Sequence, residues 1–260
     1  MSRRRLWAAA VLAGAAAPSA ALGAYQQTLY FKTFDNPFTT YTAATGTSVA
    51  TANNANYALF SGVTGSAVQI LNTRDTNNVG LHGIEIVSGT SSIGFQFSLG
   101  QSNTQDFKLL PTDMAGFVPM QNWNTLKEPV QQPKAGLDYG DTSSIESPTA
   151  GTIVDNTGTA VPGAALTFSA TNTWSVSGTS QTGDKQLLNS YLDNTNAKTP
   201  TTVTITGIPY ATYDVYAYLG SDGNGRSGHV TVASPPIPEP ATLGVLGLAG
   251  VGLLTRRRRT

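Results

Sequence analysis

The sequence predicts an all-β protein, folded as an antiparallel, jelly-roll-like β-sandwich. Between its two ends the chain is rich in threonine, serine, glycine and asparagine, and poor in lysine, glutamate and leucine. This composition disfavours helices and favours strands joined by turns. Short runs of alternating apolar and polar residues recur along the chain, with turn residues between them, as is typical of a sandwich.

The clearest alternation lies in residues 93–99, where every second side chain is apolar and would point to one face. In residues 213–219 the same rule puts Val215 on one face and Tyr216 and Tyr218 on the other. The predicted strands are residues 29–34, 57–60, 67–72, 83–87, 93–98, 165–170, 174–177, 201–206, 213–219 and 229–232.

Only one segment has a helical pattern. In residues 184–192 the apolar side chains of Leu187, Leu188 and Tyr191 recur at helical spacing, so we expect a helix there. Residues 101–163 are predicted to be mostly loop because five prolines interrupt them.

The N-terminus has the three parts of a secretory signal peptide. Arg3, Arg4 and Arg5 form a basic region, residues 6–17 an apolar helix-forming region, and residues 18–24 a small-residue exit. We expect a signal helix over residues 1–24 that directs the chain to the Sec translocon.

The C-terminus combines a rigid motif, an apolar segment and a basic cluster. The apolar residues 241–255 would form a helix about 22 Å long at about 1.5 Å per residue, which is short for a bilayer core of about 30 Å. The arginines behind it can snorkel and would stay in the cytoplasm, so we expect a short transmembrane helix. The motif is Pro238, Glu239 and Pro240, and the basic cluster is Arg256, Arg257, Arg258 and Arg259.

This order of motif, apolar segment and arginines closely resembles the PEP-CTERM sorting signal. An exosortase recognises and processes that signal in Gram-negative bacteria that make exopolysaccharide. The resemblance implies export from the cytoplasm, a transient intermediate in the inner membrane, and a mature form at the cell surface or in the extracellular matrix. Exosortase and exopolysaccharide are the partners it suggests.

Four regions are therefore expected: a signal peptide (1–24), a β-sandwich domain (25–233), a proline-rich spacer (234–237) and a sorting tail (238–260). Seven of the 15 basic residues are arginines of the two ends, which leaves eight against 14 acidic residues when Glu239 is set aside with the tail. The mature protein then has a net charge of about −6, which argues against binding nucleic acid. Cysteine is absent, so neither disulfides nor a lipoprotein anchor are expected.

The middle of the chain has a second resemblance, to an uncharacterised β-sandwich module of large bacterial surface proteins. In that module two segments that come early in this chain follow the others, so the resemblance implies a circular permutation joined through residues 88–92. It predicts that strands 83–87 and 93–97 are antiparallel neighbours; the alternative is a connection that crosses between the two sheets. The similar segments are residues 115–126, 184–193 and 213–228, followed in the module by 57–71 and 83–87.

Catalytic residues are not indicated. His82 lies in a turn-like Gly-Leu-His-Gly segment and His229 at a strand start, far apart in a chain that lacks cysteine and a Gly-x-Ser-x-Gly elbow. Paired carboxylates could support glycoside hydrolysis, but their spacing does not distinguish them from solvated loop acids. These carboxylates are Asp138, Asp141 and Glu146, or Asp35 and Glu85.

Asp222 and Asn224 give their loop the oxygen-rich look of a structural calcium site, as do residues 75–78. Neither segment has the distal glutamate of an EF-hand, and Asx and glycine turns have the same composition. Arg226 would pair with Asp214 or Asp222. No other cofactor is expected.

The large aromatic side chains allow two roles. We expect Trp123 and Trp174 to be buried, since a sandwich needs large core residues. Tyr216 and Tyr218 are the candidate face for stacking on a sugar ring. The expected function is thus a structural or adhesive surface or matrix protein without catalysis. The alternative is a carbohydrate-binding module for exopolysaccharide, and a glycoside-active enzyme comes third.

Overall fold

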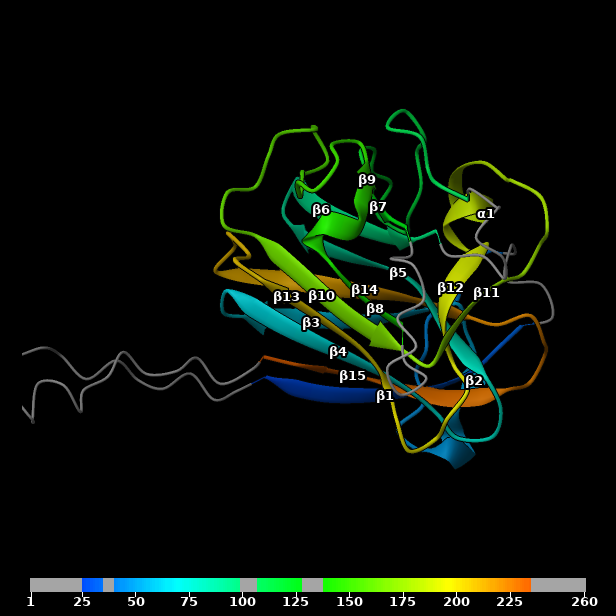
Figure 1. The fold of residues 1–260 in the computed structure, drawn as a ribbon. Helices are drawn as coiled ribbons and strands as arrows, with labels where there is room; N and C mark the ends of the chain where they lie inside the picture. Colours follow the sequence, from blue (N-terminus) through cyan, green and yellow to red (C-terminus); the bar gives the residue numbers. More distant parts are fainter. Residues whose placement is uncertain (1–24, 35–39, 99–106, 128–137, 235–260) are drawn as a thin grey trace, which may run out of the picture.

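The computed structural model describes residues 25–34, 40–98, 107–127 and 138–234, which form two β-sheets packed face to face (Figure 1). The prediction of an all-β sandwich is confirmed. The expected signal helix and the expected C-terminal helix lie outside the described residues. Within these residues, no helix has the length and apolar character that crossing a membrane requires.

The first sheet, sheet A, has seven strands, and all neighbours are antiparallel except the short pair at one edge. In spatial order the strands are β2 (Asn53–Asn54), β1 (Gln26–Lys32), β15 (Ser227–Ala233), β4 (Ala67–Arg74), β13 (Thr201–Thr206), β10 (Ala165–Ala170) and β8 (Asp138–Asp141).

The second sheet, sheet B, has eight strands. Six follow in the order β11 (Asn172–Ser175), β12 (Ser190–Asn194), β5 (Val79–Ser88), β6 (Ser91–Phe97), β7 (Asn124–Leu126) and β9 (Ile145–Ser147). The remaining two, β14 (Thr212–Gly220) and β3 (Tyr57–Thr64), continue the sheet from the other edge of β5. In sheet B the neighbours β6 and β7 are parallel, as β1 and β2 are in sheet A. Both sheets are therefore mixed rather than purely antiparallel. Three short helices complete the described elements: α1 (Gly183–Leu187), η1 (Val49–Thr51) and η2 (Thr142–Ser144).

Every strand predicted from the sequence is present, and β10 and β13 have the predicted bounds. The predicted helix over residues 184–192 is wrong in its second half, since α1 ends at Leu187 and β12 begins at Ser190. Short helices are only marginally stable alone, and β12 instead gains hydrogen bonds from β11 and β5 on its two edges. The predicted loop over residues 101–163 is interrupted by the short strands β7, β8 and β9.

The predicted hairpin of strands 83–87 and 93–97 is confirmed. β5 and β6 are antiparallel neighbours, with Ile84 opposite Phe95 and Ile86 opposite Ile93. The turn is tighter than expected, because Ser88 and Ser91 still pair and leave only Gly89 and Thr90 between the strands. Gly89 has a φ of +62°, a left-handed conformation that suits glycine in such turns.

The main hydrophobic core fills the space between the sheets. Alternating side chains from both sheets point into it, which confirms the shared face of Ile93, Phe95 and Phe97; Leu99 lies outside the described residues. Its largest members include Phe31, Phe60, Phe95, Phe97, Ile70, Leu81 and Ile84.

A third layer covers the outer face of sheet B. We call it the cap, and it consists of residues 107–123 together with α1. It packs a second apolar cluster on β3, β5, β6 and β14, so the central strands of sheet B are buried on both faces. The cluster contains Tyr57, Leu109, Ala115, Met120, Trp123, Leu187, Leu188, Tyr216 and Tyr218.

One edge of β5 changes its partner at His82. Residues 83–88 pair with β6, whereas residues 79–81 pair with β12. His82 is fully buried at this junction, and its Nδ1 lies 2.9 Å from the carbonyl oxygen of Ser190. Because a carbonyl only accepts, Nδ1 carries a proton. Burial lowers the pKa of His82 to about 3 and outweighs the hydrogen bond to Ser190.

The first and last described strands lie side by side. β1 and β15 are antiparallel with Gln26 opposite Ala233, and the amide of Ser234 donates to the carbonyl of Tyr25. Residues 25 and 234 therefore leave the domain on the same side (Figure 1).

We expect Gly94→Ala to destabilise the fold. A Cβ at Gly94 would lie 2.7 Å from Cε3 of Trp123 and 2.8 Å from Sδ of Met120, so the cap would have to shift. Such overpacking costs about 1–3 kcal/mol, measurable by denaturant unfolding. Ser91→Ala, at an exposed position of the same strand, should leave the free energy of unfolding nearly unchanged. Equal stability of the two variants would show that the cap does not pack on β6.

We expect His82 to make the fold sensitive to acid. With a folded pKa of about 3 against 6.5 for the unfolded chain, the unfolded state binds the proton first as pH falls below 6.5. Taken alone, this proton uptake by His82 should lower the free energy of unfolding by about 3 kcal/mol between pH 7 and pH 4, at about 1.4 kcal/mol per pH unit. Comparison of the wild-type protein with His82→Asn separates it from the contributions of other titrating groups. His82→Asn, which retains a donor for Ser190, should reduce this drop, and the control Ser91→Ala, at an exposed position without a titrating group, should not. An undiminished drop in His82→Asn would contradict this assignment.

Candidate functional site

Tyr216 and Tyr218 lie on the face of β14 that the sequence predicts, but that face is covered. Tyr218 is 0% exposed and Tyr216 7% exposed, because the cap packs over both. The two side chains therefore do not form an open stacking surface, which corrects the expectation. Alternation along a strand fixes the face to which a side chain points, whereas a segment distant in sequence decides what covers it.

Beneath the cap, Tyr218 pairs with a buried acid. Its hydroxyl donates to Oε2 of Glu85 at 2.6 Å and accepts from the backbone amide of Phe117 at 2.7 Å. Glu85 is fully buried, and its Oε1 has no hydrogen-bond partner among the described residues. Burial raises the pKa of Glu85 to about 8 and outweighs the hydrogen bond from Tyr218. The Glu85 carboxyl is therefore mainly protonated at neutral pH.

A second acid holds the neighbouring amide of the cap. Oδ1 of Asp184 accepts from the amide of Gly116 at 2.9 Å and from the hydroxyl of Tyr41 at 2.7 Å. Gly116 has a φ of +105°, and a Cβ there would lie 3.0 Å from Oε2 of Glu85. Only glycine fits this turn, and two side chains hold its consecutive amides.

The result is an aromatic ring held at the surface. The side chain of Phe117 is 44% exposed, although its backbone amide donates to the buried hydroxyl of Tyr218. Its ring stacks on Tyr57, with centroids 4.7 Å apart and planes at 25°, and on Tyr216, at 5.7 Å and 24°. The ring of Tyr41 meets it edge-on at 6.1 Å. One face of Phe117 thus rests on two tyrosines.

Sequence reasoning missed Phe117 as a candidate. It stands in the segment 115–126, for which the sequence suggested only a resemblance. The local signal is a glycine before an aromatic residue in a proline-containing loop, and this does not indicate whether the ring is exposed.

The carboxylates considered for glycoside hydrolysis are engaged separately. Glu85 is buried under the cap, Glu146 pairs with Lys127 at 3.2 Å, and Asp141 accepts from the amide and hydroxyl of Ser143. Asp138 belongs to β8, and Asp35 lies outside the described residues.

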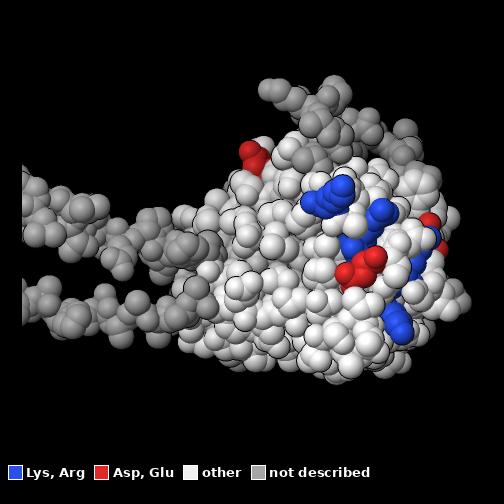
Figure 2. Space-filling model, turned by 90° about the horizontal axis from the view of Figure 1, so that it is seen from below, with Lys and Arg blue, Asp and Glu red and all other residues white. Residues whose placement is uncertain are grey.

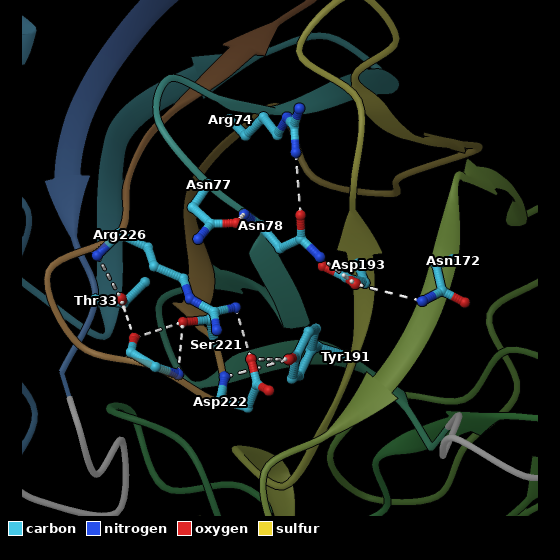
Figure 3. A network of polar contacts seen from close by, with 11 residues as sticks. Thr33, Arg74, Asn77, Asn78, Asn172, Tyr191, Asp193, Ser221, Asp222 and Arg226 are labelled. Carbon is cyan, nitrogen blue, oxygen red and sulfur yellow. Dashed lines mark hydrogen bonds and ion pairs between the residues drawn. The ribbon is translucent and has the colours of Figure 1, made fainter.

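The loop of Asp222 belongs to a polar network at the end of the sandwich (Figure 3). Oδ1 of Asp222 accepts from Nη1 of Arg226 at 2.6 Å and from the hydroxyl of Tyr191 at 3.3 Å, which confirms the predicted pairing of Arg226. Nearby, Oδ2 of Asp193 accepts from Asn78 and, at 3.5 Å, from Asn172.

The acids of this network bind neighbouring polar side chains. Burial raises the pKa of Asp193 to about 6, and the carboxylate of Asp222 already holds a guanidinium. Across the described ranges, no three histidine or acidic side chains gather as a metal site requires. Calcium at Asp222 and Asn224 stays a prediction.

The two histidines and the two tryptophans considered in the sequence analysis each lie within the packed fold. His229 pairs with Asp75 at 2.9 Å on sheet A, whereas His82 is buried in sheet B. Trp123 is buried as predicted, and its Nε1 donates to backbone carbonyls of the cap. Trp174 is only half-buried, which corrects the expectation, because β11 is an edge strand.

The sorting residues Pro238, Glu239, Pro240 and Arg256 to Arg259 lie outside the described residues. A comparison with protein-family models matches residues 236–259 to the PEP-CTERM protein-sorting motif. Comparisons with curated proteins and with solved structures found no match. The family match covers the tail alone, and the likeness of the middle region to a surface module stays a resemblance.

We expect Glu85 to make the fold less stable as pH rises. Its folded pKa of about 8 lies above the unfolded value of 4.5, so its contribution is complete below pH 4.5 and is lost as pH rises to 8. Relative to Glu85→Gln, the free energy of unfolding of the wild-type protein should fall by about 3 kcal/mol between pH 4.5 and pH 7. Chemical unfolding across this range measures it, with Glu146→Gln as the control. Parallel curves for wild type and Glu85→Gln would refute a protonated Glu85.

Proposed function

We propose that this exosortase substrate is a structural or adhesive protein of the cell surface or extracellular matrix and has no catalytic activity. The observation that carries the proposal is the PEP-CTERM motif at residues 236–259, which follows the last strand, β15, within a few residues. A chain with this motif is exported and processed by an exosortase, and its mature form is at the cell surface or outside the cell.

The surroundings of the acidic groups support a role without catalysis. General acids and nucleophiles must reach a substrate and converge on it. Among the described carboxyl groups, the one with the largest upward pKa shift, Glu85, is buried beneath the cap, and Asp141 and Glu146 each bind a neighbouring side chain.

The positions of the two ends of the domain suggest how the domain is oriented relative to the membrane. Residues 25 and 234 leave together, so a tail held in the inner membrane would turn this side toward the membrane and the opposite end outward (Figure 1). In Figure 2 most charged side chains on the visible face gather away from the chain ends, and the rest of that face is largely uncharged. A surface with few charges limits repulsion from charged polymers of a matrix.

A second function, binding of exopolysaccharide, is favoured by one specific observation. The half-exposed ring of Phe117 lies beside Asp184, an exposed acid that holds the amide of Gly116. An aromatic face next to a hydrogen-bond acceptor suits a sugar ring, and a matrix protein with such a contact would be adhesive.

We expect the protein in the surface and matrix fractions of its host to lack Arg256, Arg257, Arg258 and Arg259. Exosortase processing removes the end of the tail, so intact-mass spectrometry should find a shorter C-terminus. A chain ending at Ser234 serves as the control and should not be held at the membrane.

Two outcomes would overturn the proposed function. An intact C-terminus in the surface fraction would mean that the tail is not processed there. Release of reducing sugars from the purified matrix polysaccharide by the processed protein would make it an enzyme.

A further inference from the structure

We propose that the outer face of Phe117, together with the carboxylate of Asp184, forms a binding site for one sugar ring of a polysaccharide. The inference rests on the proposed function, which brings the mature protein into contact with extracellular polymers. It assigns the site to the cap instead of to the tyrosines of β14.

Among the described residues, the side chain of Phe117 keeps 44% of its surface exposed while it stacks on two tyrosines. One face of its ring lies over Tyr57 and Tyr216, whose planes are within 25° of its own. These two tyrosines are each 7% exposed, so Phe117 is the member of the stack that meets solvent. The face of an aromatic ring carries partial negative charge, and the C–H bonds on one side of a pyranose carry partial positive charge. A pyranose can therefore lie flat on Phe117.

The ring is held in place before any ligand arrives. The amide of Phe117 donates to Tyr218, that of Gly116 to Asp184, and Ala115 and Met120 exchange two backbone hydrogen bonds of 3.1 and 2.9 Å. This rigidity reduces the entropy lost on binding. A buried acid and a buried tyrosine thus support a turn whose outermost side chain is apolar and half-exposed.

Asp184 supplies the polar contact of the site. Its Oδ1 holds Gly116 and Tyr41, and the side chain belongs to an exposed residue at the start of α1. Tyr41 connects Asp184 to Phe117. Its hydroxyl donates to Asp184, and the centroid of its ring lies 6.1 Å from that of Phe117. Two vicinal hydroxyls of a sugar stacked on Phe117 could donate to this carboxylate.

The exposed apolar area fits a small ring better than a second protein chain. The large apolar side chains exposed on the cap are Phe117, Leu110 (53%) and Met114 (52%). A stable protein interface needs about 800 Å² per partner and about 20–30 residues. A half-exposed aromatic side chain offers about 100 Å², which matches one pyranose ring.

The test is calorimetric binding of oligosaccharides to the processed protein purified from its host. The probes are the hexasaccharides of cellulose, xylan, laminarin, mannan and chitin. We expect at least one probe to bind, Phe117→Ala to weaken that binding at least tenfold, and Phe117→Trp to retain it. Asp184→Asn should weaken it several-fold.

Tyr139→Ala is the matched control. Tyr139 is 45% exposed on β8, in the other sheet, so its loss removes an exposed aromatic ring elsewhere and should not change binding. Thermal unfolding of each variant verifies that the fold is retained, since Phe117 is too exposed for its truncation to unfold the cap.

The proposal is overturned if none of the five probes binds, or if Phe117→Ala binds as the wild type does. It is also overturned if Phe117→Ala dissociates an oligomer, because the apolar face would then bind a second copy. A processed matrix protein that binds no probe would disprove the sugar site alone. A protein that keeps its tail in the surface fraction would disprove the proposed function, whatever it binds.

Discussion

The arrangement of the cap depends on the hydrogen bond between Tyr218 and the buried carboxyl of Glu85. Tyr218 lies on the central strand β14, and its hydroxyl connects Glu85 on β5 to the amide of Phe117 in the cap. Tyr218 holds the amide of Phe117 from the sheet face, while Asp184 holds that of Gly116. The contact thus helps to hold the cap, the third layer of the domain, on sheet B, together with the apolar cluster beneath the cap.

Burial of two titratable groups on one strand gives the domain a bounded pH range. Glu85 weakens the fold as pH rises above 4.5, since burial disfavours its charged form. His82, three residues earlier on β5, weakens it as pH falls below 6.5 for the same reason. The two contributions oppose each other between these values, so their sum is most favourable there. Strand β5 therefore carries two groups that limit the pH range in which the domain is most stable.

The sequence predicted the strands well, but it did not predict which side chains are covered by other segments. Alternation located β10 and β13, because a half-buried strand leaves a period of two in the sequence. The pairing of β5 with β6 was predicted from the resemblance to a permuted surface module and is present. Alternation also put Tyr216 and Tyr218 on the correct face. The helix at residues 184–192 was wrong where pairing with two strands outweighed local spacing. Trp174 resembled a core residue, but it lies on the edge strand β11 and is only half-buried.

The sequence by itself determined the destination of the protein and its fold class. A sorting motif is linear, so Pro238, Glu239, Pro240 and the arginines behind them can be recognised without a fold, and the family comparison matched them. The tertiary structure decided which side chains meet. Glu85, Phe117, Asp184 and Tyr218 come from separate parts of the chain, and their exposure depends on how the cap folds back over sheet B. Long-range packing of this kind leaves no local period, and for that reason the exposed ring could not be read from its neighbours in sequence.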